Sequence, residues 1–227
     1  MFMRLVTTGI SNLDHLLGGG VFKGSTVLLL GPVGSGKSYV VQHFICSWLK
    51  AGERCLYIAT LEGQSNFEDA VKLNFGWGLK PFLRSGRLRF EELRDFWTIE
   101  PSQSTFERLK EKVSSAVGES RDAGIVVNNA SHLFNFSRDP QSVVRMIASL
   151  KFNAEKLGST LLLVMDKGCV DAILEENIKT LSEYALETAF RHNRERVIRV
   201  SKSIVRHGLE WHRLRVSTGE VDVELVH

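Results

Sequence analysis

The segment GPVGSGKS, residues 31–38, constrains this chain more than any other part of its sequence. It matches the pattern G-x-x-x-x-G-K-[ST] in full, with an apolar run over 26–30 before it and apolar residues at helical spacing over 40–49 after it. Glycines let successive backbone N–H groups turn toward phosphate oxygens, and the following helix adds the positive end of its dipole. The pattern therefore predicts a strand, a phosphate-binding loop and a helix.

Nucleotide binding follows from the side chains of this loop. Lys37 is placed for the β- and γ-phosphates, and Ser38 is placed for Mg²⁺. The alternative is a glycine-rich turn that matches the pattern by chance, and the flanking strand and helix argue against it. The residues predicted to bind the nucleotide are Gly31, Pro32, Val33, Gly34, Ser35, Gly36, Lys37 and Ser38.

The rest of the chain alternates apolar strands with amphipathic helices, which predicts right-handed crossovers and a mainly parallel sheet. From about Glu187 the pattern changes to short alternating strands, with turn signals at 206–208 and 218–219. We therefore predict an α/β fold with a mainly parallel twisted sheet, helices on both faces and antiparallel C-terminal strands. Further strands are expected over 54–60, 86–93, 123–129 and 159–166, and further helices near 66–75, 104–120 and 140–157.

The composition, with 43% hydrophobic and 24% charged residues among 227, is ordinary for a globular protein, and we expect a single domain over residues 1–227. The three cysteines, Cys46, Cys55 and Cys169, form no C-x-x-C pair, so neither a disulfide framework nor a zinc site is indicated. The N-terminus lacks the features of a secretory signal, and no run of about 18 apolar residues occurs. We therefore expect a cytoplasmic protein with no membrane span.

A longer segment around the phosphate loop carries a family resemblance. Residues 7–38, TTGISNLDHLLGGGVFKGSTVLLLGPVGSGKS, resemble the KaiC-like branch of the RecA superfamily, whose members open with T-G-I-x-x-L-D-x-x-L-x-G-G. The segments KAGERCLYIATLE, LNFGWGLKPFLRSGRL and RVIRVSKS…TGEVDVELV also resemble family segments, so the similarity covers most of the chain and is strongest over residues 8–90. The resemblance implies a RecA-like P-loop NTPase fold that uses ATP and Mg²⁺.

Two positions depart from the family pattern. Family members carry two adjacent glutamates after the second strand, the first thought to polarise the attacking water, and this chain has Leu61 and Glu62 there. A one-residue shift of the alignment would return Glu62 to the catalytic place. The family's Mg²⁺-shell aspartate is replaced by Asn128, which is followed by Asn129. An amide can orient a metal-bound water but brings no charge, so metal affinity and hydrolysis should both fall.

Asp166 is a candidate to compensate for these losses. It follows the apolar strand expected over 159–166 and would emerge at the carboxyl edge of the sheet, where ligands of open α/β folds bind. There it would join the metal shell or position a water. The alternative is an aspartate that only caps the turn before KGCVD. Family members often place a glutamine or similar polar residue near this strand end as a phosphate sensor.

The C-terminal quarter is locally basic, although the net charge of the chain is only +3. The family resemblance implies that a lysine and an arginine in this region reach the nucleotide of the neighbouring subunit in KaiC-like hexamers. Lys202 matches that lysine. Ile204 stands at the position of the arginine, and Arg206 is a candidate to replace it. Two alternatives are a nucleic-acid surface with bases stacked on aromatics such as Trp211, and a solvated face of edge strands. The cations concerned are Arg191, Arg194, Arg196, Arg199, Lys202, Arg206, Arg213 and Arg215.

The remaining residues point to no other chemistry. The seven histidines show no paired metal spacing and are interpreted as surface or packing residues, and no G-x-S-x-G motif occurs. We expect a KaiC-like ATP-binding protein with weak or absent hydrolysis, acting as a homo-oligomer, such as a hexamer, or with a protein partner. The alternatives are an active oligomeric ATPase that uses Glu62 and a RecA-like nucleic-acid-binding ATPase. Domains of this type also occur in archaeal motility motors and in signalling.

Overall fold

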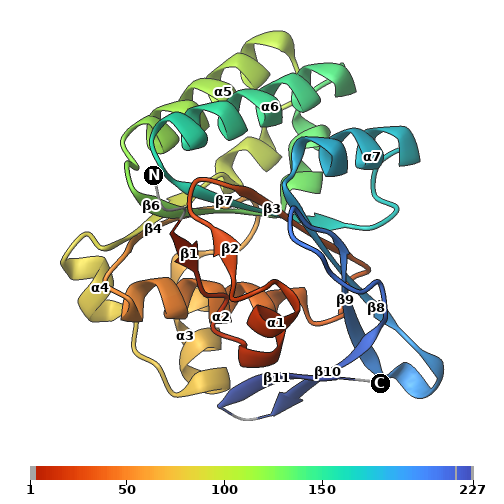
Figure 1. Ribbon diagram of the computed structural model, residues 1–227. Coiled ribbons are helices and arrows are strands. Elements are labelled where there is room, and N and C mark those ends of the chain that lie inside the picture. The colour runs from red at the N-terminus through yellow and green to blue at the C-terminus, as the bar shows by residue number, and fades with distance from the viewer. Residues whose placement is uncertain (1–3, 218, 226–227) are drawn as a thin grey trace.

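The computed structural model describes residues 4–217 and 219–225. Within these residues a nine-stranded sheet has the strand order β11-β10-β9-β8-β3-β7-β6-β4-β5, and a separate pair is formed by β1 and β2 (Figure 1). The strands are β1 Leu5–Val6, β2 Val21–Phe22, β3 Thr26–Gly31, β4 Arg54–Ala59, β5 Leu88–Glu92, β6 Ala123–Asn128, β7 Thr160–Asp166, β8 Tyr184–Phe190, β9 Arg196–Lys202, β10 His212–Ser217 and β11 Glu220–Glu224.

Helices cover both faces of this sheet. Figure 1 shows α1 to α4 on one side of it and α5, α6 and α7 on the other. The helices are α1 Ser11–Leu16, α2 Lys37–Lys50, α3 Gln64–Phe75, α4 Lys80–Arg84, α5 Gln103–Gly118, α6 Pro140–Lys156 and α7 Ala172–Leu181, with 3₁₀ turns η1 Arg94–Thr98, η2 Ala130–Phe136 and η3 His192–Arg194. Of these helices, none is long and apolar enough to cross a bilayer.

The central strand β3 belongs to two hydrophobic cores at once. Val27 and Leu29 pack into the core that includes α1, α2 and α3, whereas Leu28 and Leu30 pack into the core beneath α5, α6 and α7. A strand that is apolar at every position suits this place, because successive side chains point to opposite faces and both faces are buried. Because β3 is packed on both faces, the phosphate loop that follows it begins at a firmly held strand.

A glycine lets the helix after the phosphate loop lie close to the sheet. Trp48 of α2 is 1% exposed, and a Cβ built on Gly124 of β6 would overlap the atoms of its ring. Helix α2 is therefore held at its N-terminus by the phosphate loop and near its C-terminus by the packing of Trp48 against the sheet.

The parallel strands end at one edge of the sheet, as the sequence predicts. Gly31, the last residue of β3, pairs with Asp166 of β7. Asn128 of β6 pairs with Val164 of β7 on one side and with Ala59 of β4 on the other. Asp166 therefore lies on the strand next to the phosphate-loop strand, and Asn128 lies one strand farther away.

The predicted antiparallel C-terminal strands are present as β9, β10 and β11. Residues 167–186, for which the sequence pattern predicts no element, form α7 and the start of β8, and β8 is parallel to β3. The turn predicted at 206–208 lies in the connection between β9 and β10. In the turn predicted at 218–219, Thr218 lies outside the described residues.

A buried carboxylate joins α7, β8 and β9 beside the phosphate-loop strand. Glu187 of β8 pairs with Leu30 of β3 and is 3% exposed. It accepts hydrogen bonds from Lys179 Nζ of α7 at 2.8 Å and from Arg199 Nη2 of β9 at 2.7 Å. Burial acts to raise the pKa of Glu187, but the hydrogen bonds from these two cations outweigh it and lower the pKa to about 2.

Replacing Glu187 by Gln is expected to lower the free energy of unfolding at pH 7 by about 1–3 kcal/mol, less than for a fully buried pair because Lys179 and Arg199 keep some contact with water. The wild-type carboxylate supplies stability above its ordinary pKa of 4.5, and this stability is lost as the pH falls toward about 2. The reason is that the unfolded chain binds a proton in this window and the native state does not. Urea unfolding measured from pH 7 to pH 2 tests this.

The matched control is Glu176→Gln, which removes an exposed carboxylate from α7 and should leave the stability of the wild type nearly unchanged. If the free energy of unfolding falls equally below pH 4.5 in wild type and in Glu187→Gln, the stabilising role given to the Glu187 carboxylate is contradicted.

Candidate functional site

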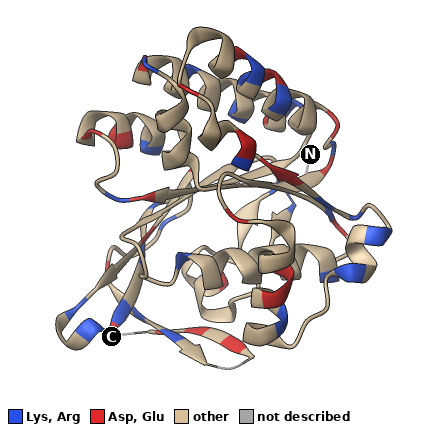
Figure 2. Cartoon of the chain, turned by 180° about the vertical axis from the view of Figure 1, so that it is seen from behind, with Lys and Arg blue, Asp and Glu red and all other residues tan. Residues whose placement is uncertain are grey.

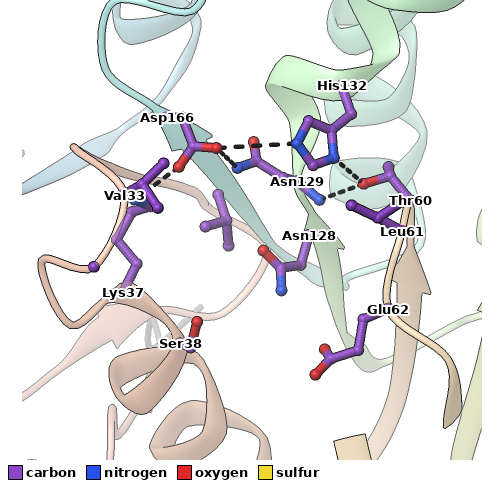
Figure 3. A pocket seen from close by; sticks show the side chains of 12 residues that line it. Val33, Lys37, Ser38, Thr60, Leu61, Glu62, Asn128, Asn129, His132 and Asp166 are labelled. Carbon is purple, nitrogen blue, oxygen red and sulfur yellow. Dashed lines mark hydrogen bonds and ion pairs between the residues drawn. The ribbon is translucent and has the colours of Figure 1, made fainter. Parts of the chain in front are cut away.

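The largest concentration of predicted site residues surrounds one cavity at the carboxyl edge of the sheet (Figure 3). Its volume is about 310 Å³. The side chains come from the phosphate loop, from the ends of β4, β6 and β7, and from η2. The lining residues are Val33, Gly34, Lys37, Ser38, Thr60, Leu61, Glu62, Asn128, Asn129, His132, Val164 and Asp166.

The phosphate loop is held in shape by the strands beneath it. Gly34 and Gly36 have φ values of +81° and +101°, a region that favours glycine. Ser35 Oγ lies 2.7 Å from Thr188 Oγ1 of β8, and Arg196 Nε of β9 donates to Gly34 O at 3.0 Å. The backbone curvature that the sequence motif predicts is therefore present and is fixed by contacts from outside the loop.

Lys37 is fully engaged by oxygen atoms of its own chain. Its ammonium group donates to Gly31 O at 2.7 Å and to Pro32 O at 2.8 Å, and it lies 2.8 Å from Asp166 Oδ1. Three acceptors match the three protons of an ammonium group. A phosphate that binds Lys37 must therefore replace one or more of these partners.

The side chain of Asp166 points into the cavity and does not cap the turn that follows β7. In addition to its ion pair with Lys37, it accepts a hydrogen bond from Asn129 Nδ2 at 2.6 Å, and its backbone N–H donates to Ser131 Oγ at 2.9 Å. Figure 3 shows Asp166, Asn129 and His132 side by side across the cavity from Ser38. Asp166 therefore lies beside the phosphate loop, and its part in a metal shell or in positioning a water stays a prediction.

Asn128 and Glu62 are joined through a tyrosine. Asn128 Nδ2 donates to the hydroxyl of Tyr57 at 2.6 Å, and this hydroxyl donates to Glu62 Oε2 at 2.9 Å. Burial raises the pKa of Glu62, and burial followed by the neighbouring Glu62 carboxylate raises the pKa of Tyr57. Glu62 lines the cavity on the wall opposite the phosphate loop, where Leu61 is 55% exposed.

Sequence reasoning missed His132, which was interpreted as a surface or packing residue together with the other histidines. Its Nδ1 lies 2.8 Å from Thr60 Oγ1, and its Nε2 lies 4.0 Å from Asp166 Oδ2. Burial lowers the pKa of His132, with Asp166 acting in the opposite direction. The available signal was position, because His132 follows Asn128 by four residues and so lies just beyond the strand end that carries the site.

Three of the eight cations named in the basic C-terminal quarter form ion pairs with carboxylates among the described residues. Arg199 pairs with Glu187, Arg215 pairs with Glu224 at 2.7 Å, and Arg213 pairs with both Glu195 and Glu224. In Figure 2 acidic and basic segments are interspersed along the chain. These pairs neutralise part of the local positive charge, and no ion pair is found among the described residues for Arg191, Arg194, Arg196, Lys202 and Arg206.

Lys202 and Arg206 do not line the cavity of their own chain. The ammonium group of Lys202 donates to Lys179 O and Thr180 O at 3.0 Å each, so it caps the carboxyl end of α7. Arg206 is exposed in the connection after β9, and no ion pair is found for it among residues 4–217 and 219–225.

Comparison with known proteins identifies related sequences. A family model described as "ATPase: KaiC" matches residues 6–221. The circadian clock protein KaiC2 of Synechocystis is 32% identical over 151 residues, which cover 64% of this chain and 25% of KaiC2. A UPF0273 protein of Thermotoga maritima is 27% identical over 172 residues, which cover 71% of this chain and 69% of that protein. The chain thus spans about a quarter of the length of the first relative.

Comparison with solved structures gives the fold. The crystal structure of a KaiC-like protein from the hyperthermophilic archaeon Pyrococcus horikoshii superposes with a TM-score of 0.81, covering 99% of this chain and 100% of that one, at 17% sequence identity. The RecA-like P-loop fold expected from the sequence is therefore confirmed.

Proposed function

The chain belongs to the KaiC-like family of ATPases, and from this premise we propose that it binds Mg²⁺-ATP at the phosphate loop and hydrolyses it slowly or not at all. The observation that carries the proposal is the contrast between the two walls of the cavity. The loop wall keeps its glycines, Lys37 and Ser38, whereas the opposite wall presents Asn128 and Leu61 where the family has an aspartate and a glutamate.

The residues present fit a magnesium nucleotide. The left-handed glycines turn backbone N–H groups toward a phosphate, and Lys37 is within reach of that place. Ser38 and Asp166 offer the oxygen ligands that Mg²⁺ prefers. When bound, the ion neutralises charge on the phosphates.

Asp166 takes over part of the role of the missing aspartate in this proposal. Its strand is the direct neighbour of the phosphate-loop strand, so its carboxylate lies beside Lys37, whereas Asn128 donates its amide to Tyr57. The Oδ1 atom of Asn128 remains able to accept a hydrogen bond from a metal-bound water. Metal binding is therefore retained, with one carboxylate in a changed position.

Weak hydrolysis follows, in this proposal, from the two positions at which the catalytic pattern of the family is lost. Leu61 carries no polar atom, and the neighbouring Glu62 is committed to the Tyr57 hydroxyl through one of its oxygens. Active turnover with Glu62 as the water-positioning group is the second candidate, favoured by the fact that Glu62 lines the cavity. Its removal by Glu62→Gln would then abolish turnover, which the first candidate does not require.

ATP acts here as a ligand whose binding favours one conformation or assembly state, which needs only different affinities for the two states. The other subunits of a homo-oligomer, such as a hexamer, or a protein partner would bind preferentially to the chain in that state. Lys202 and Arg206 lie away from their own cavity, as residues that contact a neighbour's nucleotide must. The circadian-clock name of one relative is in keeping with a regulatory use of ATP. Nucleic-acid binding is not favoured, because Arg199, Arg213 and Arg215 of the basic C-terminal strands are held in ion pairs within the chain.

Wild-type protein is expected to bind ATP and release phosphate at a rate near the background, while Leu61→Glu/Asn128→Asp releases it at least about 10-fold faster, because a positioned acid-base group contributes about 10²–10⁴-fold to such reactions. Lys37→Ala is expected to lose ATP binding. Filter retention of ATP and a phosphate-release assay measure both quantities. Equal release from wild type and the double variant would show that the site is not degraded.

Asp166→Asn is expected to separate the two roles of this carboxylate. Without Mg²⁺ the variant should bind ATP several-fold more tightly, because Lys37 is released and a negative charge beside the phosphates is removed. Addition of Mg²⁺ should raise the ATP affinity of the variant by a smaller factor than it raises that of the wild type, because a metal ligand is lost. Calorimetric titration with EDTA and with Mg²⁺ measures both effects.

Asp69→Asn removes the same charge from an exposed position on α3 and serves as the matched control. If Asp166→Asn responds to Mg²⁺ as wild type does, Asp166 has no part in metal binding.

A further inference from the structure

His132 occupies the cavity wall that faces Lys37 (Figure 3). It belongs to η2, directly after the end of β6, and its side chain is 24% exposed. The ring of Trp97 packs against it edge to face, with centroids 5.4 Å apart and planes at 80°, and Trp97 Nε1 is anchored to Thr60 O at 2.7 Å. The position of the imidazole is therefore fixed from outside the cavity.

The hydrogen bonds of Thr60 are compatible with a tautomer of this ring that carries its proton on Nε2. Thr60 Oγ1 accepts from the backbone N–H of Asn129 at 2.8 Å, so the single proton of its hydroxyl is available for His132 Nδ1 at 2.8 Å. A neutral imidazole that accepts at Nδ1 carries its proton on Nε2. The Nε2–H group then faces the cavity side of the ring.

This Nε2–H group lacks an acceptor among the residues that the structure describes. The nearest acidic oxygen, Asp166 Oδ2, lies 4.0 Å away, which is too far for a direct hydrogen bond, and it already accepts from Asn129. The other oxygen of Asp166 is held by Lys37. Lys37 and His132 thus flank the same carboxylate, and a ligand oxygen that draws Lys37 away from Asp166 arrives beside a free donor.

We propose that His132 is a specificity-determining residue that donates a hydrogen bond from Nε2 to a terminal phosphoryl oxygen, and so distinguishes a nucleoside triphosphate from a diphosphate. The inference rests on the proposed nucleotide binding. The loop N–H groups serve the phosphates that both nucleotides share, whereas the γ-phosphate extends past them to Lys37, on the side of the cavity where His132 lies.

The test measures binding of the β,γ-imido analogue of ATP and of ADP, both with Mg²⁺. His132→Phe keeps a ring against Trp97 but removes the donor, and it is expected to weaken binding of the triphosphate analogue about 10-fold, as befits a hydrogen bond to a charged group. Its affinity for ADP should stay within about 2-fold of wild type. His132→Gln retains an amide donor and should restore most of the lost affinity. His15→Phe, at an exposed histidine on α1, is the matched control.

Selective loss in His132→Phe with recovery in His132→Gln supports the assignment. Equal weakening of both nucleotides, or no weakening of either, overturns it, because His132 would then support only the fold or nothing at the site. Should the Phe variant fail to fold, His132→Leu removes the donor in its place, and the same selective loss of triphosphate binding is then required. Wild-type protein that binds neither nucleotide would refute the proposed function itself, and the inference with it.

Discussion

The ion pair between Lys37 and Asp166 organises the whole site. It forms because β3 and β7 are adjacent parallel strands in a register that places Gly31 opposite Asp166. Both strands are apolar on two faces, so neither can slide by one residue without moving its side chains into the wrong core. The position of the carboxylate beside the lysine is thus a consequence of core packing, and the side chains of Asn129 and His132 lie next to it.

Two separate polar networks meet at the end of β6. Asn129 connects to Asp166, and through its backbone N–H to Thr60 and His132. Asn128 connects to Tyr57 and Glu62 in the opposite direction. Asn128, the last residue of β6, thus contacts the far wall of the cavity, and Asn129, the next residue, contacts the side of the phosphate loop. Two amides can hold both networks together without placing further negative charge near the phosphates, which suits retention of a nucleotide more than its hydrolysis.

The sequence predicted the parts of this protein that repeat a strong local pattern. Continuous apolar runs indicate β3 and β7, and the full phosphate-loop pattern between a strand and a helix indicates the phosphate cradle. The spacing of residues along the chain cannot show that Asp166 reaches Lys37, because that depends on the strand order and register. The place of His132 beside Asp166 likewise depends on the strand order, although its position four residues after Asn128 was a signal. Helix α7 and the start of β8 were not predicted. Glu187 illustrates the reason, because a charged residue in a buried strand is stable only when partners such as Lys179 and Arg199 pair with it.

The central claim is that the cavity holds a nucleoside triphosphate intact. The most direct test loads wild-type protein with less than one equivalent of γ-labelled ATP and Mg²⁺, incubates it for hours, quenches it in acid and identifies the labelled species. We predict that nearly all bound label remains in ATP. Label recovered mainly as free phosphate after a few minutes, in protein that loses this activity on Lys37→Ala, would contradict the claim.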